Sequence, residues 1–134
     1  MIALLLAQAA LPTVAALPRQ QLPAQGCAAY LWSVTDRRLV AMAVAEPGTV
    51  RIALEGAPTD LRRIGQAGPG GYGFGDTNSY MRGDVAVTLA MTVAARPDLS
   101  DGATVPQGTL TVARAGGDAL VLPVAGLIGC ARPR

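Results

Sequence analysis

The stretch Asp84–Ala95, with the sequence DVAVTLAMTVAA, decides the fold class of this chain. Apolar side chains recur at every second position from Val85 to Val93, and Thr88 and Thr92 alternate with them. A period of two is the pattern of a β-strand with one buried face and one exposed face. The stretch is the longest run of this kind in the chain, so we expect it to form a central strand.

Shorter apolar runs of the same kind lie on both sides of this stretch. They are Cys27–Val34, Leu39–Ala45, Thr49–Glu55, Thr109–Arg114, Ala119–Val124 and Gly126–Cys130. Thr59–Ile64 fits either a single capped helical turn or another short strand, and we favour the strand. Turn sequences such as Glu46-Pro47-Gly48 separate the runs. The sequence therefore predicts an all-β domain, a small antiparallel barrel or sandwich of about seven or eight strands.

Two segments predict irregular backbone within this pattern. Arg96–Gly108 contains two prolines and predicts a long loop. Pro123 lies inside an apolar run, and proline has no N–H to donate to a neighbouring strand. We therefore expect Pro123 at an edge strand or a bulge.

The composition narrows the possible functions. The chain has 134 residues, enough for one domain, and it contains no histidine. Without histidine there is no His-based catalytic triad, no histidine general base and no His-ligated metal site. All eleven basic residues are arginines, scattered along the chain with a net charge of +2, and they form no cluster for nucleic acid. We expect a protein that is not an enzyme and that needs no metal or cofactor.

The N-terminal segment predicts export. Met1–Ala16 is apolar and rich in small residues, and Val14 and Ala16 occupy the −3 and −1 positions of a signal-peptidase site before Leu17. The run is shorter than the ~20 residues that a membrane span needs. We expect a signal peptide at residues 1–16, a linker at residues 17–26 and a single β domain at residues 27–134, in the periplasm or outside the cell. The alternative is that the segment forms a buried strand or helix.

The two cysteines, Cys27 and Cys130, lie near opposite ends of the expected mature chain. An even number of cysteines in an exported domain favours a disulfide bond. Two alternatives remain, namely a pair of free thiols and a lipid attached to Cys27.

The segment Leu61–Leu89 holds most of the aromatic residues of the chain in a glycine-rich surrounding. Its partner-binding candidates are Tyr72, Phe74, Tyr80 and Arg82. Aromatic and arginine side chains often carry the binding energy of protein interfaces. The alternative interpretation is that the aromatic side chains fold back and cover one end of the sheet.

Other short motifs in this part of the chain are weaker. Gly68, Gly70 and Gly73 fit G-x-G-x-x-G, but no helix pattern follows them, so we interpret them as loop glycines. The oxygen ligands near Asp76 and Asn78 lack the spacing of a calcium-binding loop. The serines have no histidine or lysine partner that would activate them.

The same segment resembles the membrane-bound and periplasmic inhibitors of c-type lysozyme. The positions that carry the resemblance are Leu54-Glu55-Gly56, Leu61, Ala67, Tyr72, Arg82-Gly83-Asp84 and Ala86. That family has a Ser-Ala-Ser-Gly-x-x-Tyr stretch followed by Lys-Gly-Asp/Glu-x-Ala. The resemblance implies a small exported β-barrel, often with a cysteine near the first strand bonded to one at the C-terminus. It also implies a loop that enters the lysozyme cleft, where a serine and a lysine bind the catalytic carboxylates.

This chain departs from the family pattern at several positions. Gly68 and Pro69 stand where the family has Ser-Gly, so the hydroxyl is missing. Arg82 replaces the lysine and keeps its charge. The part from Met91 to Gly129 is longer than the family's tail. We therefore expect an exported binding protein, with lysozyme inhibition as its specific function, or alternatively a structural or assembly component of the cell envelope.

Overall fold

The computed structural model describes residues 11–96 and 102–131, and this part of the chain contains strands and no helix. The strands are β1 (Val14–Ala15), β2 (Gly26–Ser33), β3 (Leu39–Val44), β4 (Thr49–Leu54), β5 (Ala57–Ala67), β6 (Thr77–Arg82), β7 (Val85–Ala95), β8 (Gly102–Arg114) and β9 (Ala119–Ala131). The predicted all-β class is confirmed.

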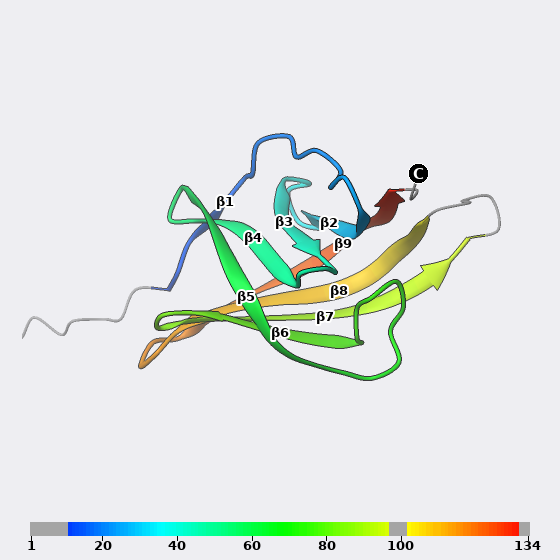
Figure 1. Cartoon of the computed structure of the whole chain (residues 1–134). Coiled ribbons are helices and arrows are strands. Elements are labelled where there is room, and N and C mark those ends of the chain that lie inside the picture. The colour runs from blue at the N-terminus through cyan, green and yellow to red at the C-terminus, as the bar shows by residue number, and fades with distance from the viewer. Residues whose placement is uncertain (1–10, 97–101, 132–134) are drawn as a thin grey trace, which may run out of the picture.

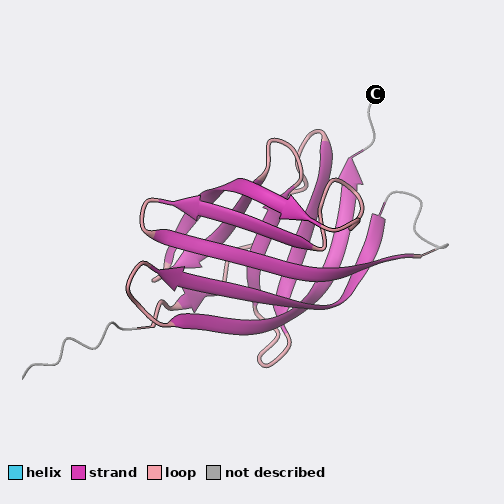
Figure 2. Ribbon diagram, turned by 90° about the horizontal axis from the view of Figure 1, so that it is seen from below, coloured by secondary structure: helices cyan, strands magenta, loops and turns pink. Residues whose placement is uncertain are grey.

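The strands from β2 to β9 form a closed antiparallel barrel, in which each strand pairs with the next one along the chain (Figures 1 and 2). β9 returns to pair with β2, and this pairing closes the barrel. The short strand β1 lies outside this circle and pairs with the end of β4, where Val14 is opposite Leu54. The barrel alternative is therefore correct, because each of the eight strands pairs with a neighbour on both sides.

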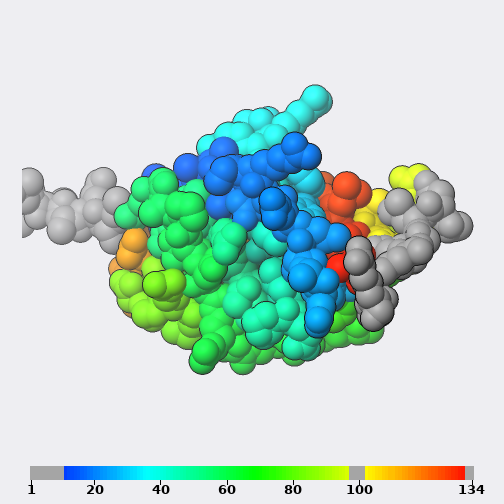
Figure 3. Space-filling model, turned by 45° about the horizontal axis from the view of Figure 1, so that its top comes forward, coloured from blue at the N-terminus to red at the C-terminus, as the bar shows by residue number. Residues whose placement is uncertain are grey.

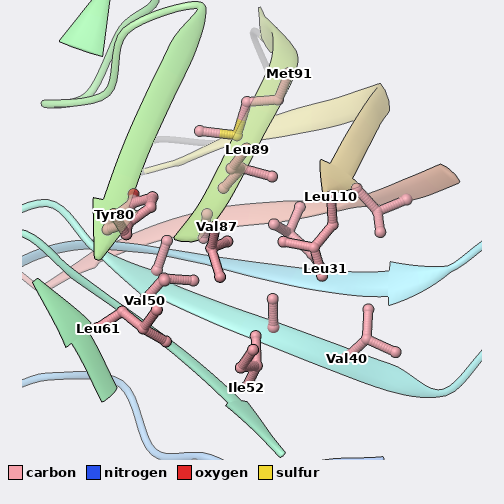
Figure 4. Close-up of a cluster of buried hydrophobic side chains, with 14 of the residues drawn as sticks. Leu31, Val40, Val50, Ile52, Leu61, Tyr80, Val87, Leu89, Met91 and Leu110 are labelled. Atoms are coloured by element: carbon pink, nitrogen blue, oxygen red, sulfur yellow. The ribbon is translucent and has the colours of Figure 1, made fainter. Parts of the chain in front are cut away.

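Alternating side chains from every barrel strand fill the interior, as the period-two pattern requires (Figure 4). The fully buried aliphatic side chains include Leu31, Val50, Val87 and Leu110. Tyr80 is the largest side chain that is fully buried. Because so few residues are aromatic, small aliphatic side chains supply most of this core.

The strands β7, β8 and β9 are long and bend around the barrel. β8 and β9 each have 13 residues, and the β8–β9 register shifts between Val105 and Gly108. Such bulges bend a strand and increase its twist. At Gly126 an added Cβ would lie 1.8 Å from the Tyr30 carbonyl oxygen, so only glycine allows β2 and β9 to approach this closely.

One expectation about irregular backbone is corrected, and the other fits the structure. The expected loop at Arg96–Gly108 is partly strand, because β8 already begins at Gly102; residues 97–101 lie outside the described part. Pro123 lies within β9 and pairs with Thr109 of β8, but the β2–β9 ladder begins only at Val124, so Pro123 has an edge position on its other side. Its carbonyl accepts a hydrogen bond from the Val34 amide just beyond the last residue of β2, so the missing N–H faces the point where β2 ends.

The disulfide bond between Cys27 and Cys130 joins the first and last strands of the barrel. The two residues are directly opposite each other in the β2–β9 ladder, with a Cα–Cα distance of 4.0 Å. They are separated by 103 positions in the sequence, so the bond closes a loop that contains most of the domain. The expected pairing is confirmed, and it is a feature of proteins in oxidising compartments.

The segment around β1 and Leu17 packs against the barrel wall (Figure 3, blue). Val14 belongs to the main core, and Leu17 forms a second cluster with Ala28, Met42 and Ala53 on the outer face of β2, β3 and β4. The amide of Leu17 donates to the Leu39 carbonyl at 2.8 Å. The expected linker thus begins as a packed segment, and the expected signal peptide includes β1.

Candidate functional site

The glycine-rich loop between β5 and β6, residues 68–76, lies at one end of the barrel. It packs against the turn between β3 and β4, where an added Cβ on Gly73 would lie 2.7 Å from the Ala45 side chain. The Arg63 guanidinium donates to the Ala45 carbonyl at 3.1 Å and to the Gly73 carbonyl at 3.5 Å. Arg63 therefore ties the loop to the neighbouring turn.

Hydrogen bonds within the loop fix its shape. Gly71 and Phe74 exchange backbone hydrogen bonds at 2.9 and 3.0 Å, and the Gly70 amide donates to an Asp76 carboxylate oxygen at 3.1 Å. The buried Asn78 amide closes the base: it accepts from the Gly75 amide and donates to the Gly75 and Leu89 carbonyls. Backbone hydrogen bonds and the side chains of Asp76 and Asn78 together hold the loop in this shape, because each of these polar groups has a partner.

Two of the four sequence-predicted contact residues are inside the barrel. Phe74 has only 2% of its surface exposed and belongs to the main hydrophobic core. Tyr80 is fully buried, and its hydroxyl has no hydrogen-bond partner among the described residues. Desolvation by burial raises the pKa of Tyr80 to about 12, although the charge of Arg63 opposes the shift. The side chains of these two residues are therefore packed in the core and are not presented to a partner.

Tyr72 is the aromatic residue of the loop that faces solvent, with 37% of its surface exposed. It occupies the tip of the tight turn between Gly71 and Phe74 and has a φ of 59°, followed by Gly73 at 89°. Positive φ at both central positions is the geometry of a type I′ turn, which normally favours glycine or asparagine. A bulky aromatic residue there is an outlier, and such outliers concentrate at functional sites.

Arg82 lies at the other end of β6. The five residue steps from Thr77 span roughly 17 Å. The Arg82 guanidinium donates to the Asp60 carbonyl at 3.1 Å and is exposed. Asp60 also pairs with Arg51, with atoms 2.7 Å apart. The structure therefore does not bring Arg82 together with Tyr72.

Sequence reasoning did not identify the residues that position the loop, which are Asn78 and Arg63. The pattern offers Asn78 only as a poorly spaced calcium ligand and does not distinguish Arg63, because asparagine and arginine are ordinary residues of loops and exposed strands. A buried asparagine in a strand can be recognised only when its hydrogen-bond partners are known.

An open groove of about 790 Å³ lies beside the loop. Its lining includes Gly70 and Asp76 from the loop and Thr92, Gln107 and Pro123 from the adjacent strands.

In the described part, residues 11–96 and 102–131, no three acidic or cysteine side chains are arranged to hold a metal ion. The same part has no helix with the length and apolarity that crossing a membrane requires.

In comparisons with known proteins, no family model, no curated protein and no solved structure matches this chain.

Proposed function

We propose that the protein is an exported, non-catalytic binding protein that contacts a protein partner with the residue 68–76 loop. The observation that carries the proposal is Tyr72, which the loop holds in solvent at a φ of 59°. Residues held in such sparsely populated backbone conformations cluster at binding and active sites. Tyrosine provides a large contact area and loses little conformational entropy on binding.

The hydrogen bonds of the loop support this proposal. An ordered loop loses little conformational entropy when it binds, so more of the contact energy contributes to affinity. The disulfide bond between Cys27 and Cys130 supports the exported location, because such bonds persist in oxidising compartments.

The first partner to test is a c-type lysozyme, because of the sequence resemblance around Tyr72 and Arg82. A lysozyme that contacted both residues would have to reach along β6 for roughly 17 Å. The proposal therefore assigns the main contact to Tyr72 and predicts a smaller contribution from Arg82.

The test is an assay of c-type lysozyme activity with the purified protein at micromolar concentration. We expect the wild-type protein to inhibit lysozyme, Tyr72→Ala to abolish inhibition, and Arg82→Glu to weaken it severalfold. Ile64→Ala, which removes an exposed side chain on β5, is the control and should inhibit normally. An inactive wild-type protein would exclude lysozyme as the partner.

A second function, as a structural or assembly component of the envelope, is favoured by the burial of Phe74. In that case the loop serves only to close one end of the barrel. Tyr72→Ala would then change neither binding nor the melting temperature, whereas Phe74→Ala would lower the melting temperature. This alternative would be contradicted if the wild-type protein captured an envelope protein and the Tyr72→Ala variant, with unchanged stability, did not.

A further inference from the structure

A second pocket lies on the barrel wall, away from the residue 68–76 loop. Its volume is about 370 Å³, within the usual range for small-molecule sites. The pocket is formed between the N-terminal segment and the outer face of the first strands. Its lining residues are Leu17, Arg19, Gln20, Tyr30, Trp32 and Leu39.

The wall contributed by the N-terminal segment is fixed in place. The Leu17 amide donates to the Leu39 carbonyl at 2.8 Å, and the Leu17 side chain is buried against the barrel. The Gln20 side chain accepts a hydrogen bond from Arg51 on β4 at 2.7 Å and donates to the Pro18 carbonyl at 2.9 Å. The pocket therefore exists before any ligand arrives.

The opposite wall is mostly apolar and continues beyond the pocket; its polar group is the Tyr30 hydroxyl, which has no hydrogen-bond partner among the described residues. Tyr30 is directly opposite Leu127 in the β2–β9 ladder, and Trp32 is opposite Ala125, so these side chains share the outer face. Leu127 is 49% exposed and Trp32 is 37% exposed. An apolar strip thus extends from the pocket along the β2–β9 seam, a surface that an extended hydrocarbon chain would cover.

The charge of the pocket is positive. Arg19 is exposed, and within the described residues its side chain has no hydrogen bond or ion pair. The six lining residues include no aspartate or glutamate. An arginine at the mouth of an apolar pocket selects an anionic group, and its guanidinium fits a carboxylate with two parallel hydrogen bonds.

We propose that this pocket binds an aliphatic carboxylate, with the carboxylate on Arg19 and the hydrocarbon chain on Trp32, Leu39 and the strip along β9. The site is separate from the loop that the proposed function uses. Its N-terminal residues, from Leu17 onward, all follow the expected signal-peptidase site. The pocket residues would therefore remain in a chain cleaved before Leu17, in which the Leu17 nitrogen becomes the N-terminal ammonium group and can still donate to the Leu39 carbonyl.

Trp32 is the only tryptophan in the chain, so its fluorescence reports on this pocket alone. Decanoate, at concentrations below those at which it forms micelles, should shift the emission to shorter wavelength with a saturable dependence. Butanoate should bind at least tenfold more weakly, because it covers less apolar surface. Decyltrimethylammonium, with the same chain and the opposite charge, should give no saturable shift.

Arg19→Gln should weaken decanoate binding about tenfold or more, because it removes the charge-assisted hydrogen bonds. Arg62→Gln, which changes an exposed arginine on β5, is the matched control and should bind like the wild-type protein. Equal affinity of Arg19→Gln and the wild-type protein, or equal binding of the cationic analogue, would overturn the proposal. A lack of saturable response to decanoate would also overturn it. None of these outcomes depends on lysozyme or on Tyr72.

Discussion

The two ends of β6 differ in how they are built. At the loop end, the Phe74 side chain is buried in the barrel core, and the Asn78 side chain forms hydrogen bonds with the Gly75 amide and carbonyl at the base of the loop. At the other end, exposed charged groups meet: Arg114 lies 3.0 Å from Glu55 and 3.6 Å from Asp84. One end is held by buried contacts and the other by ion pairs in water.

One strand therefore connects a loop that is held by buried contacts to a surface that is held by ion pairs. Buried apolar side chains stabilise the fold by leaving water, and a buried polar group costs stability when its partner is removed. Exposed ion pairs gain little, because water and salt screen them. We expect substitutions to affect stability strongly at the loop end and weakly at the charged end.

The largest effect is expected at Phe74. Phe74→Ala leaves a cavity at the loop end and should lower the free energy of unfolding by about 3–5 kcal/mol. Urea denaturation of the variant measures the change. The control is Ile64→Ala, whose side chain is 61% exposed and should cost less than about 0.5 kcal/mol. Similar values for the two variants would show that Phe74 does not pack as described.

The next effect concerns the disulfide bond, which closes the barrel by joining β2 to β9. Replacing both Cys27 and Cys130 with serine should lower the free energy of unfolding by about 2–5 kcal/mol, because the unfolded chain gains the freedom of a long loop. Thermal unfolding of the double variant and of the oxidised wild-type protein measures the difference. Identical melting temperatures would show that the bond does not stabilise the barrel.

Between the two ends, Tyr80 should make stability depend on pH. Its pKa is about 12 in the folded protein, because burial disfavours the charged form, and near 10 in the unfolded chain. Between these values the unfolded chain loses the proton first. Stability should therefore be unaffected below pH 10, fall by about 1.4 kcal/mol per pH unit up to pH 12, and remain lowered above it.

Tyr80→Phe is the matched variant for this effect, because it removes the hydroxyl that has no partner among the described residues. It should lose most of the alkaline fall in stability, because only Tyr30, whose pKa is also raised by burial, would still contribute. It should be at least as stable as the wild-type protein at pH 7. Chemical denaturation at pH 9 and pH 11 compares the two proteins. An equal alkaline fall in both would assign the titration to another group.

Asn78→Ala should cost about 2 kcal/mol, because it leaves the Gly75 amide and carbonyl without their buried partner. Gln66→Ala is the control: Gln66 is opposite Asn78 on β5, but it is exposed. Hydrogen exchange of the loop amides should accelerate in Asn78→Ala and remain slow in Gln66→Ala. Unchanged exchange in Asn78→Ala would contradict its role in fixing the loop.

The smallest effect is expected at the charged end. Arg114→Ala should cost less than about 1 kcal/mol, and the loss should shrink further as salt is added. Melting temperatures at low and high ionic strength measure it. A loss as large as that of Phe74→Ala would remove the distinction between the two ends of β6.

Several parts of the fold could be predicted from the sequence because they depend on local patterns. The alternation from Val85 to Val93 follows from the geometry of a strand, and β7 has it in the structure. The cysteine pairing followed from an even count. The environment of Pro123 was harder to predict, because whether a proline fits at this position depends on where the neighbouring strand β2 ends.

The candidate site was less predictable, because the types of the residues do not tell which way their side chains face. Phe74 and Tyr72 are two positions apart, and both are aromatic, yet one is buried and the other is exposed. The positive φ of Tyr72 and Gly73 sets this difference, and it interrupts the simple alternation of a strand. Arg82 seemed to be a neighbour of the loop because it is close in sequence, but β6 separates the two.

The sequence by itself determined the strand class and the composition of the core, and it favoured the pairing of its two cysteines. These depend on the period of apolar side chains and on the number of thiols, which are properties of the chain alone. Only the tertiary structure decided the closed barrel, the inward direction of Phe74 and Tyr80, and the pocket beside Trp32. Those features arise from contacts between segments that are distant in the sequence, and their positions are known only once every strand is paired.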